Sequence, residues 1–135
     1  MDLSKTLHIA SAGMQAQGTR LRLIAENLAN TDSVGQRPGD DPYRRQTIHF
    51  ENALNRELGI NQVKVSRLDH DQSDFGRKFE PGHPAADEEG YILTPNVNGL
   101  IEMADMREAQ RSYESNLKII ESSRDMLQQT VGILR

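Results

Sequence analysis

Residues 3–28 read LSKTLHIASAGMQAQGTRLRLIAENL, and this stretch decides the fold. Its apolar or small residues recur in alternating steps of four and three, the spacing of a heptad seam on one face of a helix, with Gln17 as the polar interruption. The seam positions are Leu3, Leu7, Ala10, Met14, Leu21, Ile24 and Leu28. We expect a helix over roughly residues 3–30, with Asn30 in the left-handed region at its C-terminal end.

The same spacing returns at the other end of the chain, where Gln110 and Arg124 are the polar exceptions. Its positions are Met103, Met106, Tyr113, Leu117, Ile120, Leu127, Val131 and Leu134. We expect a second helix over roughly residues 99–134. Asn98 can cap this helix, and Glu102 and Asp105 favour its positive N-terminal end.

The middle of the chain carries short strand patterns separated by turn residues. The expected strands are Tyr43–Phe50, Gln62–Leu68 and Tyr91–Thr94, with Phe75–Glu80 a weaker candidate and Glu51–Leu58 expected as a short helix or irregular link. The fold class is therefore α+β: two long antiparallel, heptad-patterned, coiled-coil-like terminal helices with a small β-rich middle. The expected domains are residues 1–30 plus 99–135, helical and assembly-forming, and residues 31–98, an extended loop with the β-rich segment.

The terminal helices carry more apolar surface than a two-helix hairpin would bury. Additional apolar positions are Ile9, Ala12, Ala16, Leu23, Ala25, Ala104, Ala109 and Ile119. Gly13 and Gly18 weaken the first helix, each by about 1 kcal/mol relative to Ala, and with Ser11, Ala12 and Ala16 they form a small-residue face for close helix approach. A closed hairpin remains the simpler alternative, but the surplus surface favours packing in a bundle of several chains.

Composition excludes several functional classes. The net charge of −4 does not indicate nucleic-acid binding, and the absence of cysteine excludes disulfides and thiolate metal sites. The start of the chain, Met1–Lys5, lacks the pattern of a cleavable signal peptide, and no apolar run reaches the ~20 residues that span a bilayer, so membrane insertion is not expected.

Catalytic and metal-binding patterns are weak throughout the chain. Asp69, His70 and Asp71, with Asp74 and His83 nearby, lack paired metal-ligand spacing, and Asp74 occupies the position that an EF-hand reserves for glycine. No phosphate-binding loop or nucleophile elbow occurs. We therefore expect no enzyme, cofactor or metal site, with a hydrolase using His70, Asp71 and His83 as a distant alternative.

Arg44 and Arg45 beside Tyr43 form a basic pair that could bind phosphate. We expect them instead to alternate across a strand and meet carboxylates, either on a neighbouring chain or in the acidic middle segment.

Short sequence motifs indicate a protein family, which the heptad periodicity alone does not. Residues 11–17 (SAGMQAQ), followed by Arg20-Leu21 and by residues 24–30 (IAENLAN), strongly resemble the N-terminal signature of bacterial flagellar rod and hook axial proteins. Further strings resemble the proximal-rod members of that family: residues 41–45 (DPYRR), 81–84 (PGHP) with Asp87 and Gly90-Tyr91, 95–98 (PNVN) with Glu102-Met103 and Asp105-Met106, and 111–114 (RSYE). The loop at residues 35–40 and Glu80, where Asp is usual, depart from the pattern.

The resemblance implies a structural subunit of the proximal rod in the flagellar basal body, which transmits torque. It implies export through the flagellar type III apparatus without a cleaved signal peptide, terminal helices packed as an inner tube and the middle segment outside. The implied partners are other copies of the chain, related rod proteins, the ring adaptor and the export apparatus. The expected assembly interface consists of the two seams together with Asn27 and Asn30. A soluble coiled-coil adaptor that binds a partner helix through the same seams is the alternative.

Overall fold

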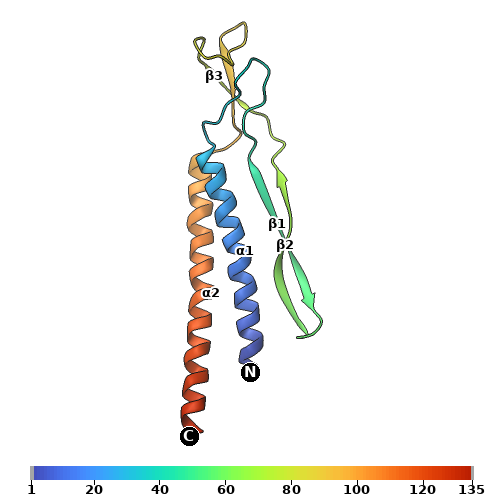
Figure 1. Cartoon of the computed structure of the whole chain (residues 1–135), viewed down its shortest axis with the longest axis vertical. Coiled ribbons are helices and arrows are strands. Elements are labelled where there is room, and N and C mark those ends of the chain that lie inside the picture. The colour runs from blue at the N-terminus through green and yellow to red at the C-terminus, as the bar shows by residue number, and fades with distance from the viewer. Residues whose placement is uncertain (1, 135) are drawn as a thin grey trace. The chain divides into compact units, whose positions relative to one another are not determined.

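The computed structural model describes residues 2–134, as two long helices and four strands (Figure 1). The elements follow in the order α1 (Leu3–Ala29), β1 (Gln46–Asn55), β2 (Ile60–His70), β3 (Gly76–Phe79), β4 (Tyr91–Thr94) and α2 (Gly99–Ile133). The prediction of terminal helices flanking a β-rich middle is confirmed. Met1 and Arg135, the outermost positions of the expected helical domain, lie outside the described residues.

Side chains cap the start of each helix. The carboxylate of Asp2 accepts a hydrogen bond from the Ser4 N–H at 3.1 Å, and Asn98 Oδ1 accepts one from the Leu100 N–H at 3.1 Å. Each bond satisfies an amide that has no partner within its helix, so the predicted cap at Asn98 is confirmed.

The end of α1 differs from the prediction. Asn30 does not adopt the left-handed conformation, since no non-glycine residue of the described chain has a positive φ. Its backbone N–H and its side-chain Nδ2 both donate to the carbonyl of Glu26, at 3.1 and 2.8 Å. These two bonds satisfy a carbonyl of the last turn, so the left-handed turn is not required.

Strands β1 and β2 form a two-stranded hairpin. The turn is closed by the Gly59 N–H, which donates to the Asn55 carbonyl at 2.8 Å, and Gly59 has a φ of 63°. The prediction of a short helix or irregular link over Glu51–Leu58 is wrong for residues 51–55, because β1 continues to Asn55, whereas residues 56–58 form a turn. Pairing with β2 supplies the backbone partners that a helix would otherwise provide.

Strands β3 and β4 form a second antiparallel pair, with Gly76 opposite Thr94 and Phe79 opposite Tyr91. The weaker strand candidate Phe75–Glu80 is thus confirmed. The Phe79 and Tyr91 rings meet edge to face, with centroids 5.2 Å apart. At Gly76 an added Cβ would collide with the Thr94 hydroxyl, so a larger residue at this strand position would require the Thr94 side chain to move.

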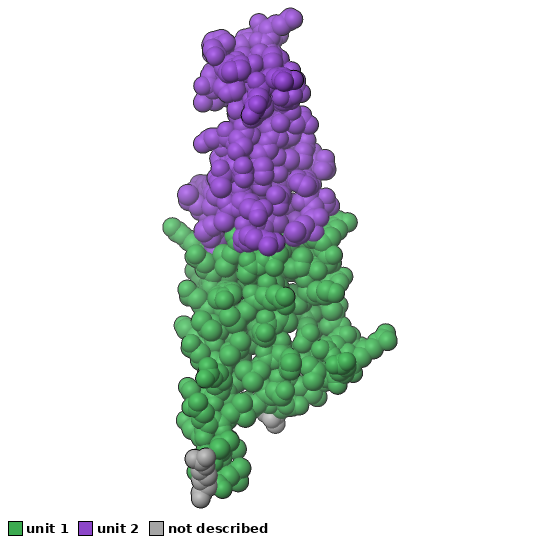
Figure 2. Space-filling view, viewed as in Figure 1, with its two compact units in different colours: residues 1–21, 48–67, 107–135 green, residues 22–47, 68–106 purple. Residues whose placement is uncertain are grey.

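The described chain separates into two compact units, coloured in Figure 2. The second unit consists of Arg22–Thr47 and Leu68–Met106, and the first consists of the remaining described residues, including Ile48–Arg67. Both helices contribute residues to both units, so each unit has its own helix pairing and its own buried residues.

The buried side chains are few, and those of the first unit are small. In the first unit they are Ala10, Ala16, Ala109 and Ser123, and in the second they are Leu23, Ile24, Pro42, Ile92, Pro95, Asn27 and Glu102. Burying a large aliphatic side chain contributes about 1.5–3 kcal/mol, whereas alanine contributes far less. The chain therefore holds its helices together with little internal apolar burial and leaves many large apolar side chains exposed.

Candidate functional site

In the first unit, α1 and α2 pack antiparallel along a seam of small and polar residues. Arg20 forms an ion pair with Glu108 at 3.5 Å, and further along Gly13 lies against Asn116. A Cβ added at Gly13 would come within 2.8 Å of Asn116 Nδ2, whereas at Gly18 it would meet nothing within 4 Å. Close approach through a small-residue face is therefore confirmed at Gly13, and within the described chain no helix approaches Gly18, where it stays a prediction.

The expected interface residues divide by exposure. Ala10, Ile24 and Asn27 are buried. The half-buried group is Leu3, Leu7, Met14, Leu21, Leu28, Asn30, Met106, Tyr113 and Ile120. The exposed group is Met103, Leu117, Leu127, Val131 and Leu134. Four of the exposed members are on α2 and Leu134 directly follows it, so the apolar stripe of this helix is only partly used within the chain.

The expected seam of α2 does not contain its most enclosed positions in the first unit. Ala109 and Ser123 are buried there and Asn116 is half-buried. These three residues repeat every seven positions, and each directly precedes a seam residue or one of the seam's polar exceptions. Ala109 was among the additional apolar positions, but asparagine and serine carry no apolar signal, so only the sevenfold spacing could have revealed the row.

Exposed apolar side chains gather on the C-terminal part of α2 and at Leu134 directly after it, in the first unit. We call Leu117, Ile119, Met126, Leu127, Val131, Ile133 and Leu134 the C-terminal apolar surface. Counting ten residues along each helix from the Gly13–Asn116 contact places Leu3 level with Met126. The helix continues beyond this point to Ile133, so its last turns extend past the start of α1. In the second unit, Leu100, Ile101 and Met103 form a smaller exposed apolar group.

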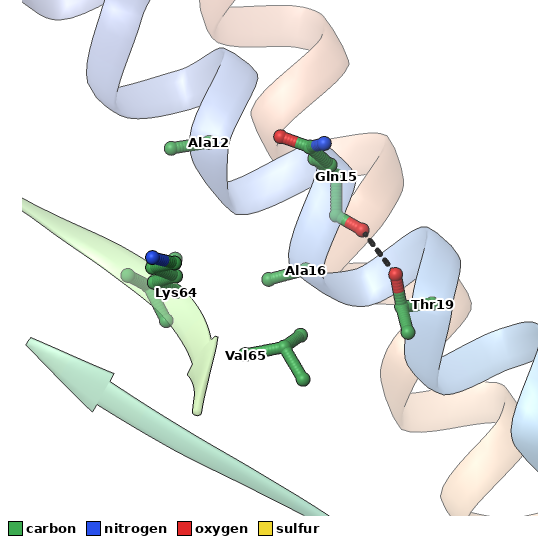
Figure 3. Close-up of a pocket in the computed structure, with 7 residues that line it drawn as sticks. Ala12, Gln15, Ala16, Thr19, Lys64 and Val65 are labelled. Atoms are coloured by element: carbon green, nitrogen blue, oxygen red, sulfur yellow. Dashed lines mark hydrogen bonds between the residues drawn. The ribbon is translucent and has the colours of Figure 1, made fainter. Parts of the chain in front are cut away.

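A shallow groove of about 250 Å³ separates α1 from β2 in the first unit (Figure 3). Ala12, Gln15, Ala16 and Thr19 line one side and Val63, Lys64 and Val65 the other. Val63 and Val65 are half-buried and Lys64 is exposed, as the predicted alternation of β2 requires. Small and apolar residues dominate the lining, so the groove holds no constellation suited to catalysis.

A polar cluster in the second unit is centred on Asn27, whose side chain is fully buried. Asn27 Oδ1 accepts hydrogen bonds from the Tyr43 hydroxyl at 2.8 Å and the Gln46 N–H at 2.9 Å. Asn27 Nδ2 donates to the Gln46 carbonyl at 3.0 Å and to Glu102 Oε2 at 3.3 Å. All four bonding positions of the amide are used. Burial is the main cause that raises the pKa of the Tyr43 phenol, and the negative charge of Glu26 is the next. The phenol therefore stays protonated and can donate its hydrogen bond to Asn27.

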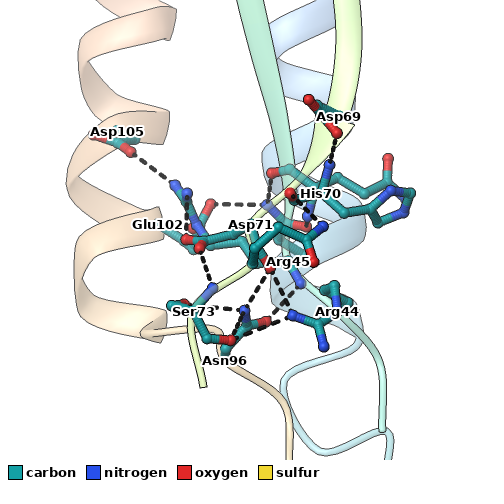
Figure 4. A network of polar contacts seen from close by, with 12 residues as sticks. Arg44, Arg45, Asp69, His70, Asp71, Ser73, Asn96, Glu102 and Asp105 are labelled. Carbon is teal, nitrogen blue, oxygen red and sulfur yellow. Dashed lines mark hydrogen bonds and ion pairs between the residues drawn. The ribbon is translucent and has the colours of Figure 1, made fainter. Parts of the chain in front are cut away.

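Arg45 joins Glu102 to the rest of the polar cluster (Figure 4). Its Nε donates to Glu102 Oε1 in a short contact, while its terminal nitrogens lie 3.7 Å from Asp71 Oδ2 and 3.8 Å from Asp105 Oδ2. Glu102 is fully buried, and a buried carboxylate requires a charged partner of this kind. The prediction that the arginine pair meets a carboxylate of the acidic middle segment is confirmed for Arg45 through Asp71. The predicted alternation of the two arginines across a strand is wrong, because both precede β1, which begins at Gln46.

Arg44 has a different role from Arg45. It donates from one terminal nitrogen to the carbonyls of Asp71 at 3.0 Å and Ser73 at 3.3 Å, and its guanidinium lies 4.2 Å from the centre of the Phe75 ring. It therefore secures the chain around Asp71 and Ser73 by hydrogen bonding and cation–π contact, and carboxylates are not its partners in these contacts.

Among residues 2–134 no cluster of three or more His, Asp or Glu side chains is placed to hold a metal ion. Neither α1 nor α2 combines the length and the apolar character that crossing a bilayer demands.

Comparison with known proteins gives a consistent result. The domain family described as "Flagellar basal body rod FlgEFG protein C-terminal" matches residues 88–133. The chain is 49% identical over 133 residues to the flagellar basal-body rod protein FlgC of Agrobacterium fabrum, covering 98% of this chain and 96% of that protein. It is 36% identical over 152 residues to FlgC of Borreliella burgdorferi (100% and 99% covered) and 32% identical over 143 residues to FlgC of Bacillus subtilis (95% of each).

Proposed function

The chain belongs to the flagellar basal-body rod protein FlgC family and is a structural subunit of the rod, and we propose that it assembles through its terminal helices to transmit torque in the proximal rod. Residues 1–30 and 99–135 are the inner, assembly-forming part in this proposal. Residues 31–98 are the outer part.

The C-terminal apolar surface is the single observation that carries the proposal. Val131 is 56% exposed and Ile133 84%, although each is an aliphatic side chain on a helix, and Leu134 directly after the helix is 82% exposed. Burying such a side chain fully would contribute about 1.5–3 kcal/mol. A hairpin complete in itself would not leave this surface uncovered, so we infer that other chains of the rod cover it on assembly.

The proposed partners follow from the family. Other copies of the chain and related rod proteins would pack against the helices, with the ring adaptor at one end of the rod. The chain would reach the basal body through the flagellar export apparatus, in the part of the rod that spans the periplasm, without a cleaved signal peptide. The family is structural, which agrees with a chain that is not an enzyme, and the adaptor alternative is not favoured because the relatives carry the name of a rod protein.

A charge placed on the C-terminal apolar surface tests the proposal. Val131→Asp should leave the purified chain folded, with an unchanged circular dichroism spectrum and melting temperature, because Val131 is already exposed. A strain that carries only this variant should lose rod assembly and swimming, because the carboxylate would be buried without a partner between chains. The matched control is Gln129→Asp, which adds the same charge at a polar, exposed position of the same helix. Normal swimming of the Val131→Asp strain would refute the assembly role of this surface.

A further inference from the structure

The polar cluster of the second unit consists of two parts, and we propose that together they form a latch. One part, the platform, is Arg44, Arg45, Asp71, Ser73 and Asn96 in the middle segment. The other part is Asn27 of α1 and Glu102 of α2. In this proposal the platform is formed on its own and captures the two helix ends only when they are paired. The latch is a property of the single chain and does not depend on the proposed assembly.

The platform is held by bonds that involve neither helix. The Asp71 N–H donates to the Arg45 carbonyl at 2.8 Å, and the Arg45 N–H donates to Asn96 Oδ1 at 2.8 Å. Asn96 Nδ2 in turn donates to the carbonyls of Asp71 at 3.0 Å and Ser73 at 3.2 Å. These contacts fix the backbone on both sides of the Arg45 side chain. The guanidinium is thereby positioned before a helix carboxylate arrives.

The Asp71 carboxylate strengthens the platform further. It accepts a hydrogen bond from the Ser73 N–H at 2.9 Å, and this bond is the main reason that the pKa of Asp71 lies below its ordinary value. Asp71 is therefore ionised at neutral pH and lies 3.7 Å from Arg45. Arg45 retains a negative partner in the middle segment whether or not Glu102 is present.

The helix part, unlike the platform, is not stable without its partners. The Glu102 side chain is 1% exposed, and its two oxygens meet Arg45 and Asn27. A carboxylate buried without its cation is destabilised by several kcal/mol, so Glu102 becomes buried only when Arg45 and Asn27 are both in place. Asn27 is on α1 and Glu102 on α2, so this requirement makes docking of the platform and pairing of the helix ends one cooperative event.

Asn27 also sets where the middle segment docks. Its side-chain amide bonds both the N–H and the C=O of Gln46, as the backbone of a neighbouring strand would. This pairing fixes the first residue of β1 against the end of α1 and does not depend on the side chain at position 46. A one-residue shift of the segment would break both bonds, so the latch also specifies register.

Amide hydrogen exchange of the full-length chain, measured residue by residue by NMR, separates the two parts. The Gln46 amide reports the latch because it donates to Asn27. The Arg45 and Asp71 amides report the platform. In Glu102→Gln the charge that holds Arg45 is removed while the shape is kept. We expect Gln46 exchange to accelerate by roughly tenfold or more, the effect of losing a charged hydrogen bond, and the two platform amides by less than about threefold.

The matched control is Glu108→Gln, which removes another arginine-paired carboxylate from α2 at a position that is 68% exposed. It should leave all three amides unchanged. If Glu102→Gln does not fold, Arg45→Lys provides the second test, because it keeps the positive charge and the platform backbone bonds but shortens the reach to Glu102. In Arg45→Lys we again expect exchange of the Gln46 amide to accelerate more than exchange of the two platform amides. Equal acceleration of all three amides, an unchanged Gln46 amide, or unfolding of both variants would each overturn the latch.

Discussion

Gly13 of α1 lies directly against the side-chain amide of Asn116 on α2, so close that an added Cβ would approach Asn116 Nδ2 to 2.8 Å. Gly18 lies on the same helix with nothing within 4 Å of the corresponding position. The two glycines thus share a helix and differ in their surroundings. Comparing them separates the intrinsic effect of glycine in a helix from the effect of helix packing.

Alanine substitution at the two glycines should give different outcomes. Gly18→Ala should raise the free energy of unfolding by about 0.5–1 kcal/mol, because alanine is the better helix former and the space is open. Gly13→Ala should gain less than Gly18→Ala, or lose stability, because Asn116 must move. Thermal unfolding monitored by circular dichroism measures both. The double variant Gly13→Ala with Asn116→Ala should recover the gain seen at Gly18, and equal stabilisation by the two single variants would contradict the close contact.

Gln17, the polar interruption of the expected seam, carries a buried side-chain oxygen that accepts no hydrogen bond from any described residue. An unsatisfied buried polar atom costs about 1–3 kcal/mol. Replacing Gln17 by Met, which has a similar length and no amide, should therefore raise the melting temperature. Gln15→Met at an exposed position of the same helix is the control and should change it little. A lower melting temperature for Gln17→Met than for the parent chain would show that this oxygen has a partner in solution.

The helices and β1 show which features could be predicted from the sequence and which could not. Helix positions, the Asn98 cap and the β-rich middle follow from periodicity and turn residues, which act locally. The helix contact could not be predicted, because Asn116 and Ser123 of the row that begins at Ala109 are neither apolar nor charged. Likewise, β1 beyond Phe50 depends on pairing with β2, a partner that local propensity does not reveal.

The polar cluster was missed for a related reason. Asn27 and Glu102 were predicted as an interface residue and as a helix-dipole residue, and both are fully buried in contact with each other. A buried carboxylate is unusual enough that sequence patterns favour the surface for it. Only the position of Arg45, brought in from the middle segment, accounts for the burial. The meeting of these three residues depends on tertiary structure and leaves no local signal.

Asp87 should make the turn before β4 sensitive to acid. Its carboxylate accepts hydrogen bonds from the Tyr91 N–H at 2.9 Å and the Glu89 N–H at 3.0 Å, and Arg77 donates to it at 3.1 Å. These bonds, the one from Tyr91 first, hold the pKa of Asp87 below its ordinary value of 3.8. The stabilisation is therefore fully present above that value and is lost as the pH falls through the lower pKa of the folded chain.

An NMR titration of the Tyr91 amide from neutral to acid pH tests this dependence. The amide signal should shift only below about pH 4, as the carboxylate gains its proton and the bond weakens. Asp87→Asn should abolish the shift, and Glu88→Gln, a change at the neighbouring exposed carboxylate, should preserve it. A Tyr91 transition that persists in Asp87→Asn would assign the acid sensitivity to another group.

Ile24→Asp should prevent folding, whereas a substitution on the C-terminal apolar surface should prevent only assembly. Ile24 is 3% exposed, so the new carboxylate would be buried in the second unit without a cation, at a cost of several kcal/mol. We expect the purified variant to lose its cooperative thermal transition and the strain to lose swimming. Ala25→Asp, at the next residue and exposed, should keep the transition. Val131→Asp should instead fold and fail only in assembly. A folded and motile Ile24→Asp strain would show that this position is not enclosed in the working rod.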